Sequence, residues 1–67
     1  MAEMSEIRAL QIGEAVRAAC VRAALEGYEQ ARMDGLCNEG ALEVALDAVR
    51  SLDVARLVRG LSGHAGA

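Results

Sequence analysis

The chain of 67 residues has no proline, no tryptophan, no phenylalanine and no lysine, and Tyr28 is its only aromatic residue. The absence of proline removes the strongest helix breaker. No segment combines β-branched residues with alternating polarity, so we expect no strands. Ala, Leu, Arg, Glu and Met fill most positions outside the turns, and these residues favour helices. The sequence therefore predicts an all-α fold.

Long apolar runs and an excess of positive charge are also lacking. The longest apolar run, 18–21, is far shorter than the ~20 residues that span a bilayer. The first residues include no basic region followed by an apolar core, so we expect no secretory signal and a cytoplasmic protein without a membrane partner. The net charge is −3, whereas nucleic-acid binders usually carry a basic surface. A nucleic-acid partner is therefore not expected.

Residues that carry metal or catalytic chemistry are few and scattered. On a helical path, Cys20 and Cys37 are separated by roughly 20 Å, too far for an intrachain disulfide. His64 is the only histidine, and it forms no zinc-binding spacing with the cysteines. Asp34 and Glu39 make the surroundings of Cys37 acidic, which we expect to disfavour a reactive thiolate. With no nucleophile–base pair or phosphate loop, we expect no metal, no cofactor and no enzymatic activity.

Capping signals define a long first helix. Ser5 is the first good N-cap, so the sequence predicts a helix over 6–33. Gly35 fits the left-handed residue that follows a helix end, with Leu36 as the hydrophobic residue after it. The turn is predicted over 34–38, which is short enough to join antiparallel neighbours.

Asn38 is the best N-cap for a second helix, with Glu39 in its first turn. Ser51 and Asp53 are both cap-type residues and favour a break after that helix, although one continuous helix through them is the alternative. The elements predicted after the turn are a helix over 39–50, a short third helix over 54–59 stopped by Gly60, and a disordered Gly- and Ala-rich tail over 62–67. Residues 1–61 are expected to form a single domain.

The long helix carries two apolar stripes on a helical wheel. The first, the small-residue stripe, consists of Ala9, Ile12, Val16, Ala19, Cys20, Ala23, Gly27 and Ala31. The second, the large-residue stripe, consists of Ile7, Leu10, Val21, Leu25 and Tyr28. The second helix has an apolar face of its own, formed by Leu42, Ala45, Leu46, Val49 and Leu52. That face can cover one stripe only, so we expect a second copy of the chain to cover the other, with the large-residue stripe as the interface.

Two interpretations stay open for each stripe. Ala19, Ala23, Gly27 and Ala31 recur every four residues, a spacing that allows two helices to approach closely. Such a contact fits within one chain or between two, while a compositional bias toward Ala is the simpler explanation. Tyr28 fits either a boundary residue with its hydroxyl at the surface or an interface anchor.

Residues 35–40, Gly-Leu-Cys-Asn-Glu-Gly, carry a resemblance. They resemble small uncharacterised bacterial helical proteins that have a Gly-Leu-Cys-x-Glu-Gly turn before an Ala/Leu-rich helix, with a Tyr-Glu pair upstream like Tyr28-Glu29. Where those proteins have an aromatic residue after the second glycine, this chain has Ala41-Leu42. Some of them are described as acetyltransferases, but this chain is too short for an acetyl-coenzyme-A fold. The resemblance therefore implies no active site.

The sequence thus predicts an antiparallel helical hairpin, with or without a short third helix, that pairs as a homodimer into a four-helix-type bundle. We expect a non-catalytic protein–protein interaction module that binds itself and, in an extension of this hypothesis, another protein. One alternative is a small nucleic-acid-binding regulator that uses Arg50, Arg56 and Arg59. The other is an accessory subunit of a larger enzyme.

Overall fold

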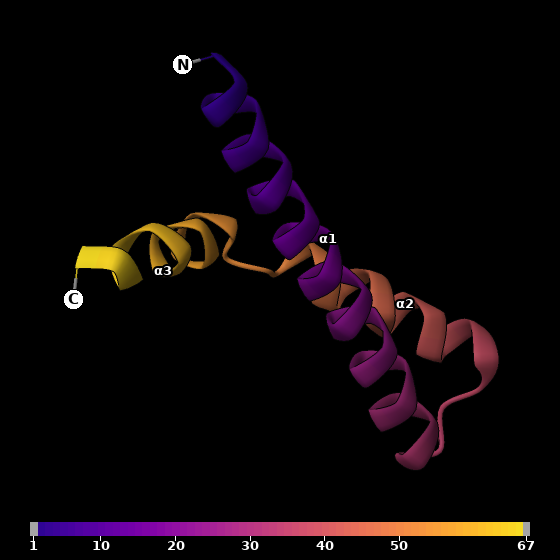
Figure 1. Cartoon of the computed structure of the whole chain (residues 1–67). Helices are drawn as coiled ribbons and strands as arrows, with labels where there is room; N and C mark the ends of the chain where they lie inside the picture. Colours follow the sequence, from indigo (N-terminus) through magenta and orange to yellow (C-terminus); the bar gives the residue numbers. More distant parts are fainter. Residues whose placement is uncertain (1, 67) are drawn as a thin grey trace. The chain divides into compact units, whose positions relative to one another are not determined.

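A computed structural model describes the backbone of residues 2–66 and the side chains of residues 5–61. In this part of the chain the fold is all-α, as predicted, with three helices and no strand (Figure 1). The helices are α1 (Ala2–Met33), α2 (Asn38–Arg50) and α3 (Val54–Gly66). The chain divides into two compact units, which are described separately. One contains the N-terminal half of α1 together with α3, and the other, Ala19–Leu52, contains the C-terminal half of α1 together with α2. The single domain predicted over 1–61 stays a prediction.

The first helix begins earlier than the sequence predicts. A start after Ser5 was expected from its capping ability, whereas α1 begins at Ala2 and Ser5 lies in its first turn. Ala, Glu and Met all have high helix propensity, so residues 2–4 extend the helix beyond the expected cap. The helix then continues without interruption through Gly13 and Gly27.

The end of α1 forms as the sequence predicts. Gly35 has a φ of +95°, in the left-handed region that favours glycine. The Leu36 N–H donates to the Ala31 carbonyl at 3.0 Å, and the Gly35 N–H donates to the Arg32 carbonyl at 3.0 Å. These two bonds form a Schellman motif, which satisfies carbonyls that the helix end leaves free. The Arg32 guanidinium also donates to the Leu36 carbonyl at 3.0 Å and so fixes the turn.

The N-cap of α2 is Cys37, and the prediction that Asn38 has this role is wrong. Cys37 has extended backbone angles (φ −72°, ψ 171°), and its carbonyl accepts the Ala41 N–H at 2.8 Å. Asn38 is instead the first residue of the helix, and its Oδ1 atom accepts a hydrogen bond from the Tyr28 hydroxyl at 3.1 Å. The Asn38 side chain therefore binds α1, and the backbone of α2 begins one residue earlier.

The break predicted over 51–53 is present. The Ser51 N–H donates to the Asp47 carbonyl at 2.9 Å and ends α2. Asp53 then caps α3, because its Oδ1 atom accepts the Arg56 N–H at 2.9 Å. An acidic cap is also favourable at the positive end of the helix dipole.

The third helix continues past the stop that the sequence predicts at Gly60 and extends to Gly66. A glycine inside a helix costs about 1 kcal/mol relative to alanine, which weakens a helix without forbidding it. A disordered tail was predicted over 62–67, whereas the backbone of 62–66 belongs to α3; Ala67 lies outside the described residues.

The buried core of the described side chains consists of alanine alone. Ala31, Ala41 and Ala45 are 3%, 0% and 5% exposed. They belong to the unit Ala19–Leu52, where α2 lies against the C-terminal half of α1. A Cβ atom added to Gly27 would lie 3.2 Å from the Ala48 Cβ atom and 3.4 Å from the Ala45 Cα atom. At Gly27, therefore, the small-residue stripe packs within the chain, and the two helix backbones approach closely.

Candidate interaction surface

Four members of the large-residue stripe are exposed on α1. The exposed fractions are 52% for Ile7, 67% for Leu10, 52% for Val21 and 59% for Leu25. Moving apolar surface from water into a protein interior is favourable by about 25 cal/mol per Å², and this stabilisation is lost where the surface stays exposed. One exposed leucine is ordinary on a protein surface, whereas several on one helix face mark a candidate interaction surface.

The fifth member of the stripe, Tyr28, has a different environment. It is half-buried, and its hydroxyl donates to the Asn38 side chain at the start of α2. This contact lies within one unit of the chain. Tyr28 thus has the boundary position that the sequence allowed, and its role as an interface anchor stays a prediction.

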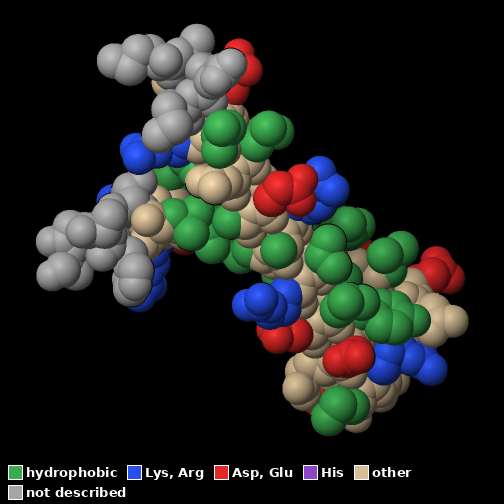
Figure 2. All heavy atoms as spheres, viewed as in Figure 1, with side chains coloured by type: hydrophobic (Ala, Val, Ile, Leu, Met, Phe, Trp, Pro, Cys, Tyr) green, Lys and Arg blue, Asp and Glu red, His purple; other side chains and the backbone are tan. Residues whose placement is uncertain are grey.

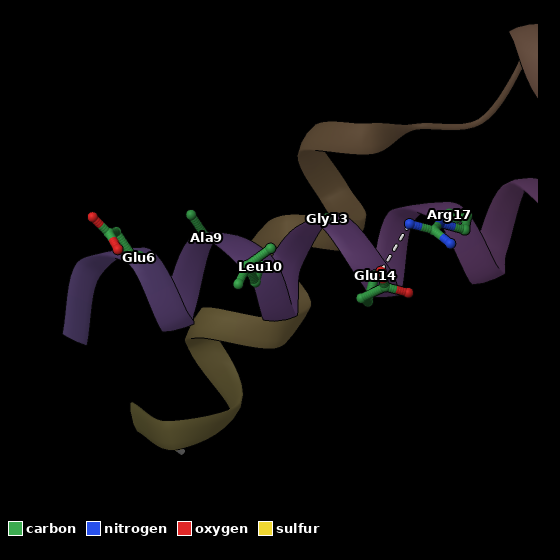
Figure 3. A pocket seen from close by; sticks show the side chains of 6 residues that line it. All are labelled: Glu6, Ala9, Leu10, Gly13, Glu14 and Arg17. Carbon is green, nitrogen blue, oxygen red and sulfur yellow. Dashed lines mark ion pairs between the residues drawn. The ribbon is translucent and has the colours of Figure 1, made fainter. Parts of the chain in front are cut away.

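A hollow on the surface of α1, here called the α1 hollow, lies beside Leu10 (Figure 3). The described residues that line it come from one face of this helix: Glu6, Ala9, Leu10, Gly13, Glu14 and Arg17. Ala9 and Gly13 have small or absent side chains, which leaves the space between their larger neighbours open. The hollow is continuous with the stripe, because Leu10 belongs to both.

A charged pair interrupts the stripe at its middle. The Arg17 Nη2 atom lies 2.9 Å from the Glu14 Oε2 atom, and the side chains are 73% and 62% exposed (Figure 3). An exposed pair of this kind contributes roughly 0–1 kcal/mol to stability. The small contribution of this ion pair to the stability of the single chain therefore does not explain why two charged residues lie within an apolar stripe.

Apolar side chains are exposed on α2 as well. Leu42, Val44 and Leu46 are 54%, 37% and 45% exposed. The sequence placed Leu42, Ala45 and Leu46 on the face that covers the first helix. Of these three only Ala45 is buried, together with Ala41, which the predicted face did not include. Figure 2 accordingly shows apolar side chains at the surface beside single charged ones. A helical wheel does not show which of these residues face α1, because the alanines and leucines of α2 form adjacent apolar faces. The alanines are buried because only small side chains fit where the two helices approach closely at Gly27.

The arginines of the nucleic-acid hypothesis are divided between the two units. Arg50 lies at the end of α2, where its Nη1 atom pairs with the Asp47 Oδ1 atom at 3.0 Å. Arg56 and Arg59 lie on α3, in the other unit. A shared basic patch formed by all three stays a prediction.

Both cysteines are free, and they differ in exposure: Cys20 is half-buried and Cys37 is exposed. The backbone N–H group of Gly40, followed by that of Glu39, lowers the pKa of the Cys37 thiol below its ordinary value. A smaller lowering comes from Arg32. The expectation that acidic neighbours disfavour the thiolate is therefore wrong. The N–H groups at the start of α2 favour the thiolate, as is common at helix N-termini.

The described residues form neither a metal-binding cluster nor a membrane-spanning helix. No group of three or more His, Cys, Asp or Glu side chains there lies close enough together to hold a metal ion. The helices in that same part include none with both the length and the hydropathy of a membrane span.

Comparisons with known proteins add no identity to this geometry. No protein-family model matches the chain, and no curated protein or solved structure matches it significantly. The exposed surface of α1 is therefore the main guide to function.

Proposed function

We propose that this protein is a small, non-catalytic helical interaction module that pairs with itself through the large-residue stripe of α1. The exposure of Ile7, Leu10, Val21 and Leu25, beside a described core made only of alanine, is the observation that supports this most. A chain of this size buries only about 60% of its unfolded surface, and small scaffolds usually need a disulfide, a metal or a partner. Both cysteines are free, so a partner is the simplest source of further burial.

The proposed architecture is an antiparallel hairpin of α1 and α2, completed by a second hairpin into a four-helix-type bundle. The close approach at Gly27 and the hydrogen bond between Tyr28 and Asn38 support the packing of α1 on α2. A twofold axis lets the same face serve both copies, because each surface then meets its own counterpart. The exposed Leu42 and Leu46 of α2 would enlarge the apolar area buried by the partner.

The molar mass in solution, measured by light scattering over a dilution series, tests this proposal. The protein should scatter as a dimer at high concentration and dissociate on dilution. A mass equal to one chain at every concentration would contradict the proposal. Circular dichroism on the same samples shows whether dissociation is accompanied by loss of helix.

A pair of matched variants tests the surface itself. Leu25→Lys places a charge in the large-residue stripe, where it should raise the Kd of the dimer at least about tenfold. Met33→Lys makes the same kind of change at a residue that is 78% exposed and lies outside the stripe. It should leave the Kd within about twofold of the unmodified value. A Leu25→Lys dimer as tight as the unmodified one would rule out this face.

A further inference from the structure

A seven-residue repeat runs along the face of α1 that carries the large-residue stripe. Its positions, here called the seam, lie alternately three and four residues apart: Ile7, Leu10, Glu14, Arg17, Val21, Ala24 and Tyr28. The seam contains four residues of the stripe, the charged pair and Ala24, and Leu25 of the stripe flanks it. This alternation is typical of the seam along which two helices pair as a coiled coil. All seven residues lie on the single continuous helix α1. Glu14 and Arg17 therefore occupy the middle of the seam, and a partner helix must accommodate both charges.

We infer that two copies of the chain pair through α1 in antiparallel orientation, with the twofold axis between Glu14 and Arg17. Glu14 of each copy then lies opposite Arg17 of the other. One layer outward on either side, Leu10 lies opposite Val21, and Ile7 lies opposite Ala24 in the layer beyond. This inference rests on the proposed function and specifies how the second copy is bound.

Charge complementarity selects this arrangement over its competitors. In a parallel pair, each residue of the seam meets its own counterpart, so Glu14 faces Glu14 and Arg17 faces Arg17. In an antiparallel pair shifted by one repeat, both charges face apolar residues and lose their partners. Like-charge and unpaired contacts are costly in a desolvated seam, and a polar layer of this kind commonly fixes the register of coiled coils.

The existing ion pair fits the same arrangement. Glu14 and Arg17 already pair within one helix at 2.9 Å while both side chains remain largely exposed. Around the twofold axis, two such pairs would alternate in sign as a ring of four charges. A network of charges contributes more than an isolated surface pair, so the dimer gives the two charged residues a role that the single chain does not.

The α1 hollow supplies an independent observation of shape. In a coiled coil, four residues at positions i, i+3, i+4 and i+7 surround a hole that receives one side chain of the facing helix. The residues of the α1 hollow form two such holes, which overlap. The first consists of Glu6, Ala9, Leu10 and Gly13, and the second consists of Leu10, Gly13, Glu14 and Arg17. In the proposed register, the first hole lies level with Val21 of the second copy. The second hole lies level with Arg17 of the second copy. The small Ala9 and Gly13 lie beside the larger side chains of the hollow, and Glu14 lies at its other edge (Figure 3). In the proposed dimer, Ala9 and Gly13 leave room for the valine, and Glu14 lines the hole that the guanidinium enters.

Charge reversal tests the proposed register. Arg17→Glu gives each copy two acids in the seam, and Glu14→Arg gives each copy two bases. Each variant alone should raise the Kd of its homodimer at least about tenfold. Mixed in equal amounts, the two variants should form a heterodimer about as tight as the unmodified homodimer. Arg22→Glu, an equal change of charge at an exposed residue outside the seam, should leave the Kd within about twofold.

Cysteine cross-linking tests the orientation, in a chain whose natural Cys20 and Cys37 are replaced by serine. Leu10→Cys and Val21→Cys chains, mixed and oxidised, should form a disulfide, because these positions share a layer. Leu10→Cys alone should not cross-link, because its two copies lie roughly 16 Å apart along the seam, beyond the ~7 Å limit between Cα atoms. A parallel pair would reverse these two results.

Failure of the register and failure of the proposed function give different results. A monomeric unmodified protein overturns both. An unmodified dimer whose Kd is insensitive to Arg17→Glu, or in which Leu10→Cys cross-links with itself, overturns only the antiparallel register. Recovery of the dimer in the mixture of Glu14→Arg and Arg17→Glu shows that neither variant dissociated merely because it failed to fold.

Discussion

At the scale of single residues, small side chains determine where the chain packs against itself. Ala31, Ala41 and Ala45 are the buried residues, and Gly27 lies at the closest approach of the two helices. Burying a leucine-sized side chain contributes about 1.5–3 kcal/mol, and a methyl group contributes less than half of this. The contact therefore positions α2 precisely while adding little hydrophobic stabilisation. Larger apolar side chains, such as Leu10 and Leu25, stay exposed on α1.

Cys37 provides the residue-scale prediction. Because the N–H groups of Gly40 and Glu39 favour its thiolate, its pKa is below the ordinary thiol value. The rate of alkylation by iodoacetamide should therefore reach half its maximum at a lower pH than that of a short unstructured cysteine peptide. The measurement uses Cys20→Ser, in which Cys37 is the only thiol. A half-maximal pH equal to that of the peptide would contradict the prediction.

The same lowered pKa has a consequence for stability. A group whose pKa is depressed by folding stabilises the folded chain at pH values above the unfolded pKa. This contribution disappears as the pH falls through the folded pKa. Cys37→Ser should therefore remove a gain in unfolding free energy that is fully present above the unfolded pKa and is lost as the pH falls through the folded pKa; urea unfolding of both proteins across this pH range measures it.

At the scale of helices, the two α1 glycines differ in what surrounds them. A Cβ atom at Gly13 would meet no described atom within 4 Å, whereas one at Gly27 would meet Ala48 at 3.2 Å. Gly13→Ala should raise the unfolding free energy by about 0.5–1 kcal/mol, because alanine favours the helix. Gly27→Ala should lower it by about 1 kcal/mol, because the added methyl group forces α2 away from α1. Urea unfolding, at concentrations where the chain is monomeric, measures both, and equal stabilisation would contradict the close packing.

The cap of α3 gives a second prediction for an individual helix. Asp53→Ala removes the carboxylate oxygen that accepts the Arg56 N–H at 2.9 Å, which should cost about 1 kcal/mol of helix stability. Asp53→Asn keeps an acceptor at the same position and should retain most of it. Hydrogen exchange of the Arg56 amide measures the difference, and it should be faster in the alanine variant alone. Equal exchange in both variants would show that the cap does not protect this helix.

Helix ends differed in how well the sequence predicted them. Gly35 and the break over 51–53 were predicted correctly, because a left-handed glycine and adjacent cap residues act locally. The cap of α2 was predicted incorrectly. The hydrogen bond that holds the Asn38 side chain comes from Tyr28, ten positions away, and therefore depends on how the helices pack. The low helix propensity of glycine also led to the prediction that the third helix ends at Gly60, whereas α3 continues through this residue.

For the whole molecule, the apolar stripes were predictable but their partners were not. A helical wheel identifies residues that share a face, and Ile7, Leu10, Val21 and Leu25 are indeed exposed together on α1. It does not identify the helix that lies opposite, which is why the predicted face of α2 included the exposed Leu42 and Leu46 beside the buried Ala45 and omitted the buried Ala41. The α1 hollow was also missed, although the nearby Ala9 and Gly13 were a signal for it.

The concentration dependence of thermal unfolding is the prediction that belongs to the whole molecule. If the folded state is a dimer, mass action raises its Tm with protein concentration. With an unfolding enthalpy of about 0.7 kcal/mol per residue over both chains of the dimer, a change of roughly a hundredfold in concentration should shift the Tm by about 10 °C. Arg22→Glu should keep this shift, whereas Arg17→Glu should lose most of it, because its seam carries like charges only. A Tm that is independent of concentration in the unmodified protein would contradict the pairing of the exposed stripe with a second copy.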